Sequence, residues 1–355
     1  MNKKITITSL FIVIFLVSLG ILLPKTLQSS YAVSTTFADT IMNLASTSAC
    51  NAGGTGVCAT NSYTENGTTK YHDYRFRGAD PNNYVSFNND IYRVIGVFDS
   101  NSHGVAGKYL VKLIRSRILG DYSWGVYNTT SGTYSNYKND WTGNTTGVKA
   151  SANVILNEFF YNKTNTSSTY GSCSSWTYYY SDNNYKTFSC SDIVGHGIDS
   201  NLRNYIEEVT WYLKGYKTYS YSKQKFYLCE RGLSTDTTNC MSANSGAYDA
   251  STISKIGLMY ASDYLYASSY FADTSTTTAS SGYYGNKNWL YKGNEWTITP
   301  KADIADNAFF VGSSGRVSNS HANNGYGVRP TFYLKSNVIV TGGSGTFDDP
   351  YTLSM

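Results

Sequence analysis

The sequence predicts an α+β fold in which antiparallel sheets are combined with two main helices and long polar surface loops. Runs rich in β-branched and aromatic residues, separated by short turns, recur over residues 83–117 and 256–340. Between these runs, apolar residues follow helical spacing in two segments, over residues 151–160 and 200–214. Strands that flank helices, instead of alternating with them one by one, are typical of the α+β class.

The first residues have the composition of an export signal. Lys3 and Lys4 precede an apolar stretch over residues 5–23, and a small-residue motif ends at Ala32. We therefore expect residues 1–32 to form a signal peptide. Because the apolar stretch approaches the roughly 20 residues that cross a bilayer, an uncleaved signal anchor in a single-pass membrane protein is the alternative. In both cases the protein is expected to be extracellular or on the cell surface.

Most of the net charge belongs to this first segment. The whole chain has a formal net charge of +4, and residues 1–32 contain three lysines and no acidic residue. The rest of the chain is therefore close to neutral. Because nucleic-acid binding needs clustered Lys and Arg, we expect no nucleic-acid partner.

The six cysteines occur as three neighbouring pairs, Cys50 with Cys58, Cys173 with Cys190, and Cys229 with Cys240. In an exported chain an even number of cysteines predicts disulfides, and we favour this sequential pairing over the other connectivities. The spacings lack the CxxC pattern and the neighbouring histidines of a zinc site, so no metal is expected.

Residues 33–69 are expected to form a stalk before a domain over residues 70–355. Apolar side chains at helical spacing predict a short helix over residues 35–45, and a Gly-rich loop closed by a disulfide follows over residues 50–58. The apolar positions of this helix are Phe37, Ile41 and Leu44.

Strands are expected next. Residues 83–98 indicate two strands separated by the turn Asn88-Asn89-Asp90, and residues 109–117 indicate a third that pairs with the second in an antiparallel hairpin. Later strands are expected at Ile256–Tyr260, Trp289–Tyr291, Trp296–Ile298, Ala308–Val311, Val328–Lys335 and Val338–Val340.

Two helices are expected between these strand regions. The first begins at Ser151, a candidate N-cap. Its buried residues are expected to be Ile155, Leu156, Phe159 and Phe160. The second begins at Ser200 and ends at Gly215, which suits the left-handed conformation after a helix. Its apolar face is expected to consist of Leu202, Ile206, Val209 and Leu213.

Two long polar segments are candidates for ligand binding. Residues 162–191 and 267–288 are dominated by Ser, Thr, Asn, Gly and Tyr, in a chain with 34 tyrosines. Tyrosine beside Ser and Asn combines rigid amphipathic contact area with adaptable hydrogen bonding, and aromatic faces also stack on sugar rings. The alternative is that the tyrosines serve only the sheets. The candidate binding residues are Tyr178, Tyr179, Tyr180, Tyr283 and Tyr284.

The sequence contains no motif with a known catalytic mechanism, such as HExxH, GxSxG, a P-loop or GxGxxG after a strand. We therefore expect neither a catalytic residue nor a cofactor. His196, close in sequence to Asp192 and Asp199, is the one histidine worth testing as an acid or base. His103 and His321 lie in Gly/Asn/Ser turns and are expected to be solvated.

Several sequence blocks follow one another in a specific order between residues 70 and 353. They include YRFRGADPNNYV at 74–85, YRVIGVF at 92–98, VKLI at 111–114, KIGLMYASDY at 255–264, NWL at 288–290, EWTITP at 295–300 and GVRPTFYLKS at 327–336. In this order the blocks resemble a family of uncharacterised exported proteins of low-GC Gram-positive bacteria and their wall-less relatives.

The closing pattern, a Trp-containing strand, an apolar strand, a turn and then Gly-Val-Arg-Pro, is similar to the end of C-type-lectin-like domains, including the formylglycine-generating-enzyme group. The resemblance implies a C-type-lectin-like scaffold for residues 70–355. It does not imply that enzyme's activity, because its paired active-site cysteines have no counterpart here and Cys229 and Cys240 are expected to form a disulfide. Arg329 is expected to be structural, paired with a carboxylate or carbonyl, and Trp289 and Trp296 are expected in the core.

Together these observations favour a non-enzymatic surface protein that binds a glycan or a protein through its Tyr/Ser/Asn-rich loops. Two alternatives stay open. One is a pilin-like or membrane-anchored component of a surface assembly, held in the membrane by residues 1–32. The other is an exported enzyme of the formylglycine-generating type, in which His196 is the residue to test.

Overall fold

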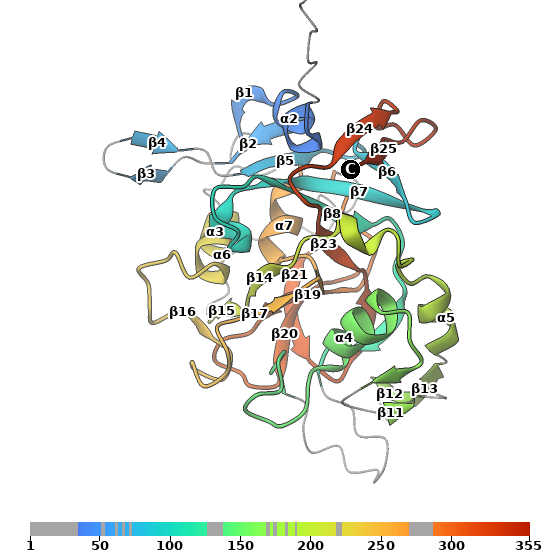
Figure 1. Cartoon of the computed structure of the whole chain (residues 1–355). Coiled ribbons are helices and arrows are strands. Elements are labelled where there is room, and N and C mark those ends of the chain that lie inside the picture. The colour runs from blue at the N-terminus through green and yellow to red at the C-terminus, as the bar shows by residue number, and fades with distance from the viewer. Residues whose placement is uncertain are drawn as a thin grey trace, which may run out of the picture. The chain divides into compact units, whose positions relative to one another are not determined.

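Two sheets organise the fold (Figure 1). The larger sheet has eight strands in the order β1-β2-β5-β7-β8-β23-β18, with β6 paired to β7, and the smaller sheet has five in the order β21-β20-β19-β22-β9. Neighbouring strands pair antiparallel except in β1–β2 and β19–β22. With helices packed between and around these sheets, the fold is α+β with antiparallel sheets, as the sequence predicts.

This computed structural model describes residues 35–355 except for 51–53, 61–62, 66–67, 71–72, 126–137, 168–170, 173–175, 182–183, 189, 218–221 and 270–286. Residues Thr36–Met355 form one unit. The expected signal segment, residues 1–32, lies outside the described residues. Within the part of the chain that is described, no helix is both long enough and apolar enough to cross a bilayer.

The strands of the larger sheet are β1 (Ser46–Ala49), β2 (Gly56–Ala59), β5 (Asp73–Arg77), β6 (Tyr84–Phe87), β7 (Asp90–Phe98), β8 (Leu110–Arg115), β18 (Ile256–Gly257) and β23 (Thr331–Tyr333). Those of the smaller sheet are β9 (Gly120–Ser123), β19 (Glu295–Pro300), β20 (Asn307–Val311), β21 (Val317–His321) and β22 (Gly325–Val328).

Six pairs of strands form two-stranded sheets. They are β3 (Tyr63–Glu65) with β4 (Thr68–Lys70), β10 (Thr166–Ser167) with β11 (Gly171–Ser172), β12 (Trp176–Ser181) with β13 (Asn184–Phe188), β14 (Val209–Tyr212) with β17 (Ser251–Ser254), β15 (Lys214–Tyr216) with β16 (Cys240–Ser242), and β24 (Ile339–Gly342) with β25 (Thr352–Ser354).

The helices are short. They are α2 (Phe37–Met42), α3 (Ser100–His103), α4 (Ser151–Val154), the π-helix η1 (Ile155–Tyr161), α5 (Cys190–Gly195), the 3₁₀ turn η2 (Arg203–Tyr205), α6 (Lys223–Glu230) and α7 (Ala261–Tyr266). Both sheets, η1 and α7 contribute side chains to one continuous buried cluster. Its largest fully buried members include Trp124, Trp141, Trp211 and Trp296.

The predicted hairpins of the larger sheet are confirmed. β6 and β7 pair antiparallel around Asn88 and Asn89, whose φ angles of 56° and 55° are the left-handed values that a tight two-residue hairpin turn requires. Asparagine tolerates this conformation better than most residues. β8 pairs antiparallel with β7, as expected for residues 109–117.

The segment expected to form a stalk contributes to the main fold. Thr36 caps α2 and shares a reciprocal pair of hydrogen bonds with Asp39, while Phe37 and Ile41 are fully buried. Leu44 lies beyond the helix end and is half exposed. β2, from the same segment, pairs with β5 of the larger sheet.

The first predicted helix is confirmed, and the second is wrong. Residues 151–161 form α4 and η1, and the four expected apolar residues are buried. Ser151 is not the N-cap as expected: it is the first helical residue, and Ala150 is the N-cap and makes no side-chain cap bond. Residues 200–214 instead form η2, β14 and part of β15. Val209 and Trp211 are buried while Thr210 and Tyr212 are half buried, a period of two that belongs to a strand.

Gly215 therefore does not end a helix. It lies in β15, where a Cβ atom would come within 1.9 Å of the Pro300 carbonyl oxygen on β19. The glycine is required because β15 passes directly against the backbone of β19.

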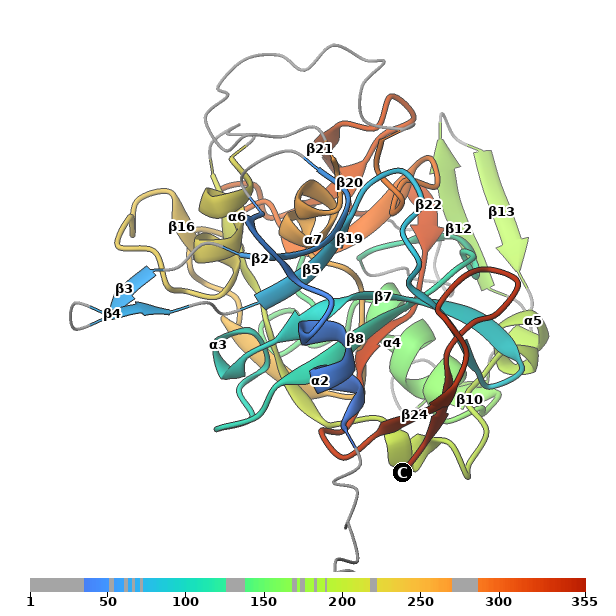
Figure 2. The same ribbon diagram turned by 90° about the horizontal axis from the view of Figure 1, so that it is seen from above.

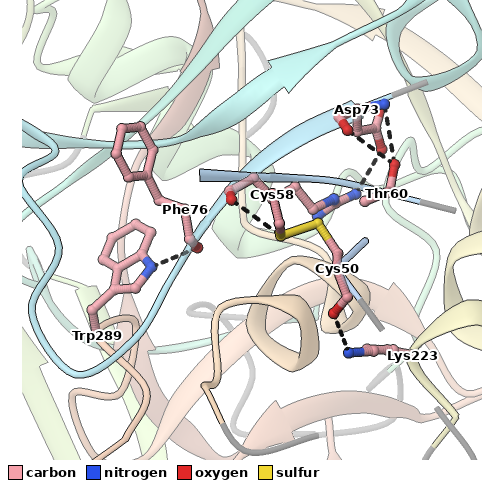
Figure 3. Close-up of a disulfide and its surroundings, with 8 residues drawn as sticks. Cys50, Cys58, Thr60, Asp73, Phe76, Lys223 and Trp289 are labelled. Carbon is pink, nitrogen blue, oxygen red and sulfur yellow. Dashed lines mark hydrogen bonds and ion pairs between the residues drawn. A yellow bond between two sulfur atoms is a disulfide. The ribbon is translucent and has the colours of Figure 1, made fainter. Parts of the chain in front are cut away.

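Strands occur within five of the six segments expected after residue 255, as β18, β19, β20, β23 and β24. Residues 289–291 do not form a strand. Trp289 is nevertheless buried, and its indole N–H donates to the Phe76 carbonyl at 2.9 Å, so the expected core position is confirmed (Figure 3).

Two predicted disulfides, Cys50–Cys58 and Cys229–Cys240, are confirmed. Figure 3 shows how the first lies in the fold: the buried Lys223 ammonium of α6 donates to the Cys50 carbonyl at 2.8 Å. This bond ties the Gly-rich loop to α6. Cys190 is also disulfide-bonded, and Cys173 lies outside the described residues.

His103 is not solvated as expected. It ends α3 with a fully buried side chain, whose ring packs edge-on against Tyr333 at 5.5 Å between centroids. The Val105 N–H donates to its Nδ1, so Nε2 carries the proton that reaches the Phe98 carbonyl at 3.1 Å. Burial lowers the pKa of this imidazole to about 4. His321 is exposed, as expected.

Candidate binding site on the five-stranded sheet

The turn between β20 and β21 is determined by its own sequence, Gly312-Ser313-Ser314-Gly315. The Gly315 N–H donates to the Gly312 carbonyl at 2.8 Å and the Gly312 N–H donates to the Arg316 carbonyl at 2.8 Å. Gly315 has a φ of 76°, which favours glycine at this position. The result is a tight hairpin loop ending in a left-handed residue.

Two tyrosine hydroxyls hold this loop from other parts of the chain. Tyr264 of α7 donates to the Gly315 carbonyl at 2.9 Å, and Tyr291 donates to the Ser313 carbonyl. Because both bonds go to the loop's backbone, its shape is set before any ligand arrives, which reduces the ordering cost of binding.

Three aromatic rings lie on one face of the smaller sheet. Trp296 of β19 is fully buried and is the Cα partner of Phe310 of β20. The Phe310 ring stacks on Tyr326 of β22 with centroids 4.5 Å apart and an interplanar angle of 15°. Tyr326 also packs on Trp296 at 4.8 Å. The buried tryptophan thus supports two half-buried rings above it.

A cavity of about 380 Å³ opens beside these rings. Its lining combines the two aromatic rings with hydroxyl, amide and guanidinium groups: Asn294, Phe310, Ser313, Ser314, Arg316, Ser318 and Tyr326. Its volume lies at the lower end of the range of small-molecule sites in proteins, roughly 300–1,000 Å³.

Arg316 gives the site its charge. The side chain is half buried, and its Nε is shielded from solvent without a hydrogen-bond partner. Among the residues that the structure describes, no carboxylate forms an ion pair with Arg316. A guanidinium in this state is suited to a carboxylate or phosphate group of a ligand.

The structure places part of the predicted binding region against one strand of this site. Tyr178, Tyr179 and Tyr180 lie in β12, which runs against β9 and against β22, the strand that carries Tyr326 (Figure 2). The side chains of these three tyrosines are outside the described residues. Tyr283 and Tyr284 lie wholly outside them.

Sequence reasoning missed Phe310, Arg316 and Tyr326. The local sequence does not mark these residues, because Phe310 and Tyr326 are half-buried positions in strands whose other residues are buried, without a regular alternation. Their contact across β19 depends on the strand order, which is not a local property of the sequence.

Several titratable groups with perturbed pKa values lie away from this cavity, in a buried charge cluster of Asp73, Arg75, Lys112, Glu230, Arg231 and Asp263. The Asp263 carboxylate accepts from Arg75 at 2.8 Å and from Lys112 at 2.6 Å. Arg231 pairs with Glu230 at 2.6 Å. None of the six side chains is more than 3% exposed, so a substrate cannot reach them without opening the core.

Burial and pairing compete within this cluster. Burial lowers the pKa of Lys112 to about 8, against the opposing pull of Asp263. Burial on its own raises the pKa of Asp263, but the adjacent Lys112 and Arg75 charges hold it well below its ordinary value. The cluster contains equal numbers of cations and anions, which is the arrangement expected of a structural network.

His196 lies at an exposed position just after α5. It lines a cavity of about 220 Å³ with Asp90, Asp199 and Lys163, whereas Asp192 is not among the lining residues. The nearby charges already have partners, since Asp90 pairs with Arg115 and Lys163 pairs with Asp199 at 2.5 Å. The structure therefore places no unpaired carboxylate beside His196 among the described residues.

Glu295 is buried in an ion pair with Arg329. Within the described ranges, no group of three or more His, Cys, Asp or Glu side chains is arranged to hold a metal ion. No family model, curated protein or solved structure matches the chain.

Proposed function

We propose that this chain is an exported surface protein without catalytic activity, and that it binds a glycan in the cavity beside Phe310, Arg316 and Tyr326. The carrying observation is that one cavity is lined by a stacked aromatic pair and by a guanidinium that forms no ion pair with any described residue. Export is supported by the composition of residues 1–32. The C-type-lectin-like scaffold stays a prediction from the sequence.

Aromatic rings and sugars are complementary. The C–H faces of a sugar ring carry slight positive charge and pack on the negative face of an aromatic ring, while sugar hydroxyls exchange hydrogen bonds with short polar side chains. Phe310 and Tyr326 supply the rings, and Ser313, Ser314 and Asn294 supply hydroxyl and amide groups in the same cavity.

Arg316 narrows the class of glycan. Since no carboxylate of the described part of the chain pairs with this guanidinium, an anionic ligand group satisfies it best, through charge-assisted, two-point hydrogen bonds. We therefore favour a glycan that bears a carboxylate or a phosphate. Both groups place an oxyanion on a sugar ring, but a carboxylate and a phosphate differ in charge and geometry.

The test is a glycan array that contains neutral oligosaccharides beside their uronate and sugar-phosphate counterparts, probed with the purified protein. Hits are then titrated with wild type and with Arg316→Ala. Charge-assisted hydrogen bonds contribute about 1.5–3 kcal/mol, so the variant is expected to lose roughly 10- to 100-fold in affinity for acidic glycans.

Arg117→Ala is the matched control, because Arg117 is 76% exposed and does not line the cavity. Phe310→Ala, which removes one of the two stacked rings, is expected to weaken binding of the same glycans. Its control is Phe347→Ala, because Phe347 is an exposed aromatic residue in the β24–β25 loop. The proposal is overturned if the folded protein binds no glycan on the array, or if Arg316→Ala and Arg117→Ala bind the hits equally well.

A further inference from the structure

A second site lies at the outer edge of β17, away from the aromatic cavity. The β14–β17 sheet has two strands, so one edge of β17 has no neighbouring strand within the described ranges. The Leu213 N–H donates to the Ala250 carbonyl at 2.7 Å, which fixes the residues of β17 that face β14. Because an antiparallel ladder alternates, Ser251 and Ile253 point their N–H and C=O groups to the open edge.

Those four backbone groups have no partner among the described residues. The Ile253 side chain on this strand is also unusual, because a large apolar side chain is 70% exposed on the outer face of the sheet. Natural edge strands are commonly protected by proline, charge, a bulge or a covering loop. The sequence Ser-Thr-Ile-Ser of β17 contains neither proline nor charge, and its register with β14 is regular.

The open edge forms one wall of a groove. A cavity of about 610 Å³ runs along Ser251–Ser254 and is lined on its other side by Asn153, Asn157 and Glu158 from α4 and η1. The wall includes a π-helix, an element that occurs frequently at functional sites. Four strand residues span about 13 Å, which is the length of backbone that the groove presents.

Each end of the groove is closed by a hydrogen-bonded side chain. The Asn157 amide donates to the Ile256 carbonyl at 2.9 Å and accepts from the Ile256 N–H at 3.1 Å, as a neighbouring strand would. At the other end Asp249 accepts from Thr142 at 2.6 Å and from Asn144 at 2.5 Å. Between these two clamps the backbone of β17 is left open.

We infer that this groove binds an extended peptide segment of a partner protein, which pairs with Ser251 and Ile253 as an added strand and packs an apolar side chain on Ile253. The chemistry of the edge points to a peptide, because donors and acceptors two residues apart match an extended backbone. We favour a partner peptide over a second copy of the chain, because in a second copy the same edge faces Asn153, Asn157 and Glu158 across the groove.

The test begins with a phage-displayed library of random dodecapeptides, selected on the purified protein. Affinities of the selected peptides are measured for wild type and Ile253→Pro. Proline removes the outward N–H of residue 253 and no bond to β14, so the fold is retained while strand pairing is blocked. The expected loss is about tenfold or more, and the control Ile253→Val, which keeps the N–H, stays close to wild type.

Amide hydrogen exchange of the wild type gives a readout that needs no variant. Without peptide, the Ser251 and Ile253 amides are expected to exchange faster than those of Thr252 and Ser254, and a bound peptide is expected to slow the first two. The inference is overturned if no peptide is selected, if selected peptides bind Ile253→Pro as well as wild type, or if these amides stay unprotected. Concentration-dependent dimerisation that Ile253→Pro abolishes would assign the edge to a second copy instead and equally overturn it.

Discussion

Arg329 and Glu295 form a buried two-point ion pair. The arginine Nε donates to Glu295 Oε1 at 2.7 Å and Nη2 donates to Oε2 at 2.8 Å. Nη2 also donates to the Leu290 carbonyl at 2.8 Å, so the pair ties the entry of β23 to β19 and to the segment before it. This confirms the structural role expected for the arginine that precedes Pro330.

Removing the charge of Glu295 is therefore expected to destabilise the fold. Glu295→Gln leaves the Arg329 guanidinium buried without a counter-charge, and breaking a buried pair in this way costs about 3–5 kcal/mol. Urea unfolding measures the change. The matched control Asp199→Asn removes a charge from the exposed Lys163–Asp199 pair and is expected to cost less than about 1 kcal/mol. Equal losses in the two variants would contradict the buried-pair account.

His103 is expected to make the fold sensitive to acid. Its Nδ1 already accepts the Val105 N–H, so protonation at that nitrogen breaks the bond inside the core. The pKa of the imidazole falls from 6.5 to about 4 on folding, so the unfolded chain binds more protons between these values. Unfolding free energy should then decrease as pH falls from 6.5 to 4, by about 3 kcal/mol from this residue.

The measurement is the slope of unfolding free energy against pH between pH 6.5 and 4. Burial raises the pKa of Asp73 and of Glu230, and these carboxyls act in the opposite direction because the folded state then holds the extra proton. The contribution of His103 is therefore the difference between wild type and His103→Gln across the window. If His103→Gln keeps the wild-type slope, the neutral buried imidazole is not the cause.

The elements that could be predicted from sequence depend on local chemistry. Asn88 and Asn89 mark their hairpin because the turn needs left-handed residues, and the flanking strands are rich in β-branched and aromatic residues. The helix at residues 151–161 follows from an apolar period with no competing pattern. Arg329, directly before Pro330, is expected to be structural from the sequence, whereas its partner Glu295 is far away in the chain and is not marked by any local pattern.

The elements that were missed depend on long-range contacts. The spacing of Val209 and Leu213 fits a helix and a strand equally well, and only the pairing of β14 with β17 decides between them. His103 is buried because α3 packs on β14, a contact that its Gly/Asn/Ser surroundings do not reveal. The candidate site is non-local in the same way, because Phe310 and Tyr326 meet only across β19.

Gly215 offers a direct test of the corrected second helix. A Cβ atom at this position would lie 1.9 Å from the Pro300 carbonyl oxygen, so Gly215→Ala must push β15 away from β19. We expect a loss of about 2 kcal/mol or more in unfolding free energy. Gly195→Ala is the control, because a Cβ there meets no atom within 4 Å, and it should change stability by less than about 0.5 kcal/mol. A stabilising Gly215→Ala would favour the helix.

The Cys50–Cys58 disulfide is expected to stabilise the start of the larger sheet. The two cysteines are eight residues apart, and closing a loop of this size is worth roughly 2–3 kcal/mol in the chain-entropy model. The double variant Cys50→Ala/Cys58→Ala should lower the urea midpoint accordingly. Amide exchange should accelerate in β1 and β2 before it does in β8, because the disulfide lies at the β1 edge. Uniform acceleration throughout the sheet would indicate that the bond stabilises the whole core instead.

The geometry of Arg316 predicts that lysine cannot replace it. A guanidinium presents two parallel N–H groups to an oxyanion, whereas an ammonium is a single point charge on a flexible stem. Arg316→Lys should therefore lose most of the affinity for acidic glycans that Arg316→Ala loses, although it keeps the positive charge.

Binding by wild type should also weaken as salt rises, because the site is half exposed and its charge is screened. Calorimetric titrations of wild type and both variants at two salt concentrations separate the contribution of the two-point hydrogen bonds from that of the positive charge. If Arg316→Lys binds like wild type, the guanidinium serves as a point charge and the two-point contact with the glycan is wrong.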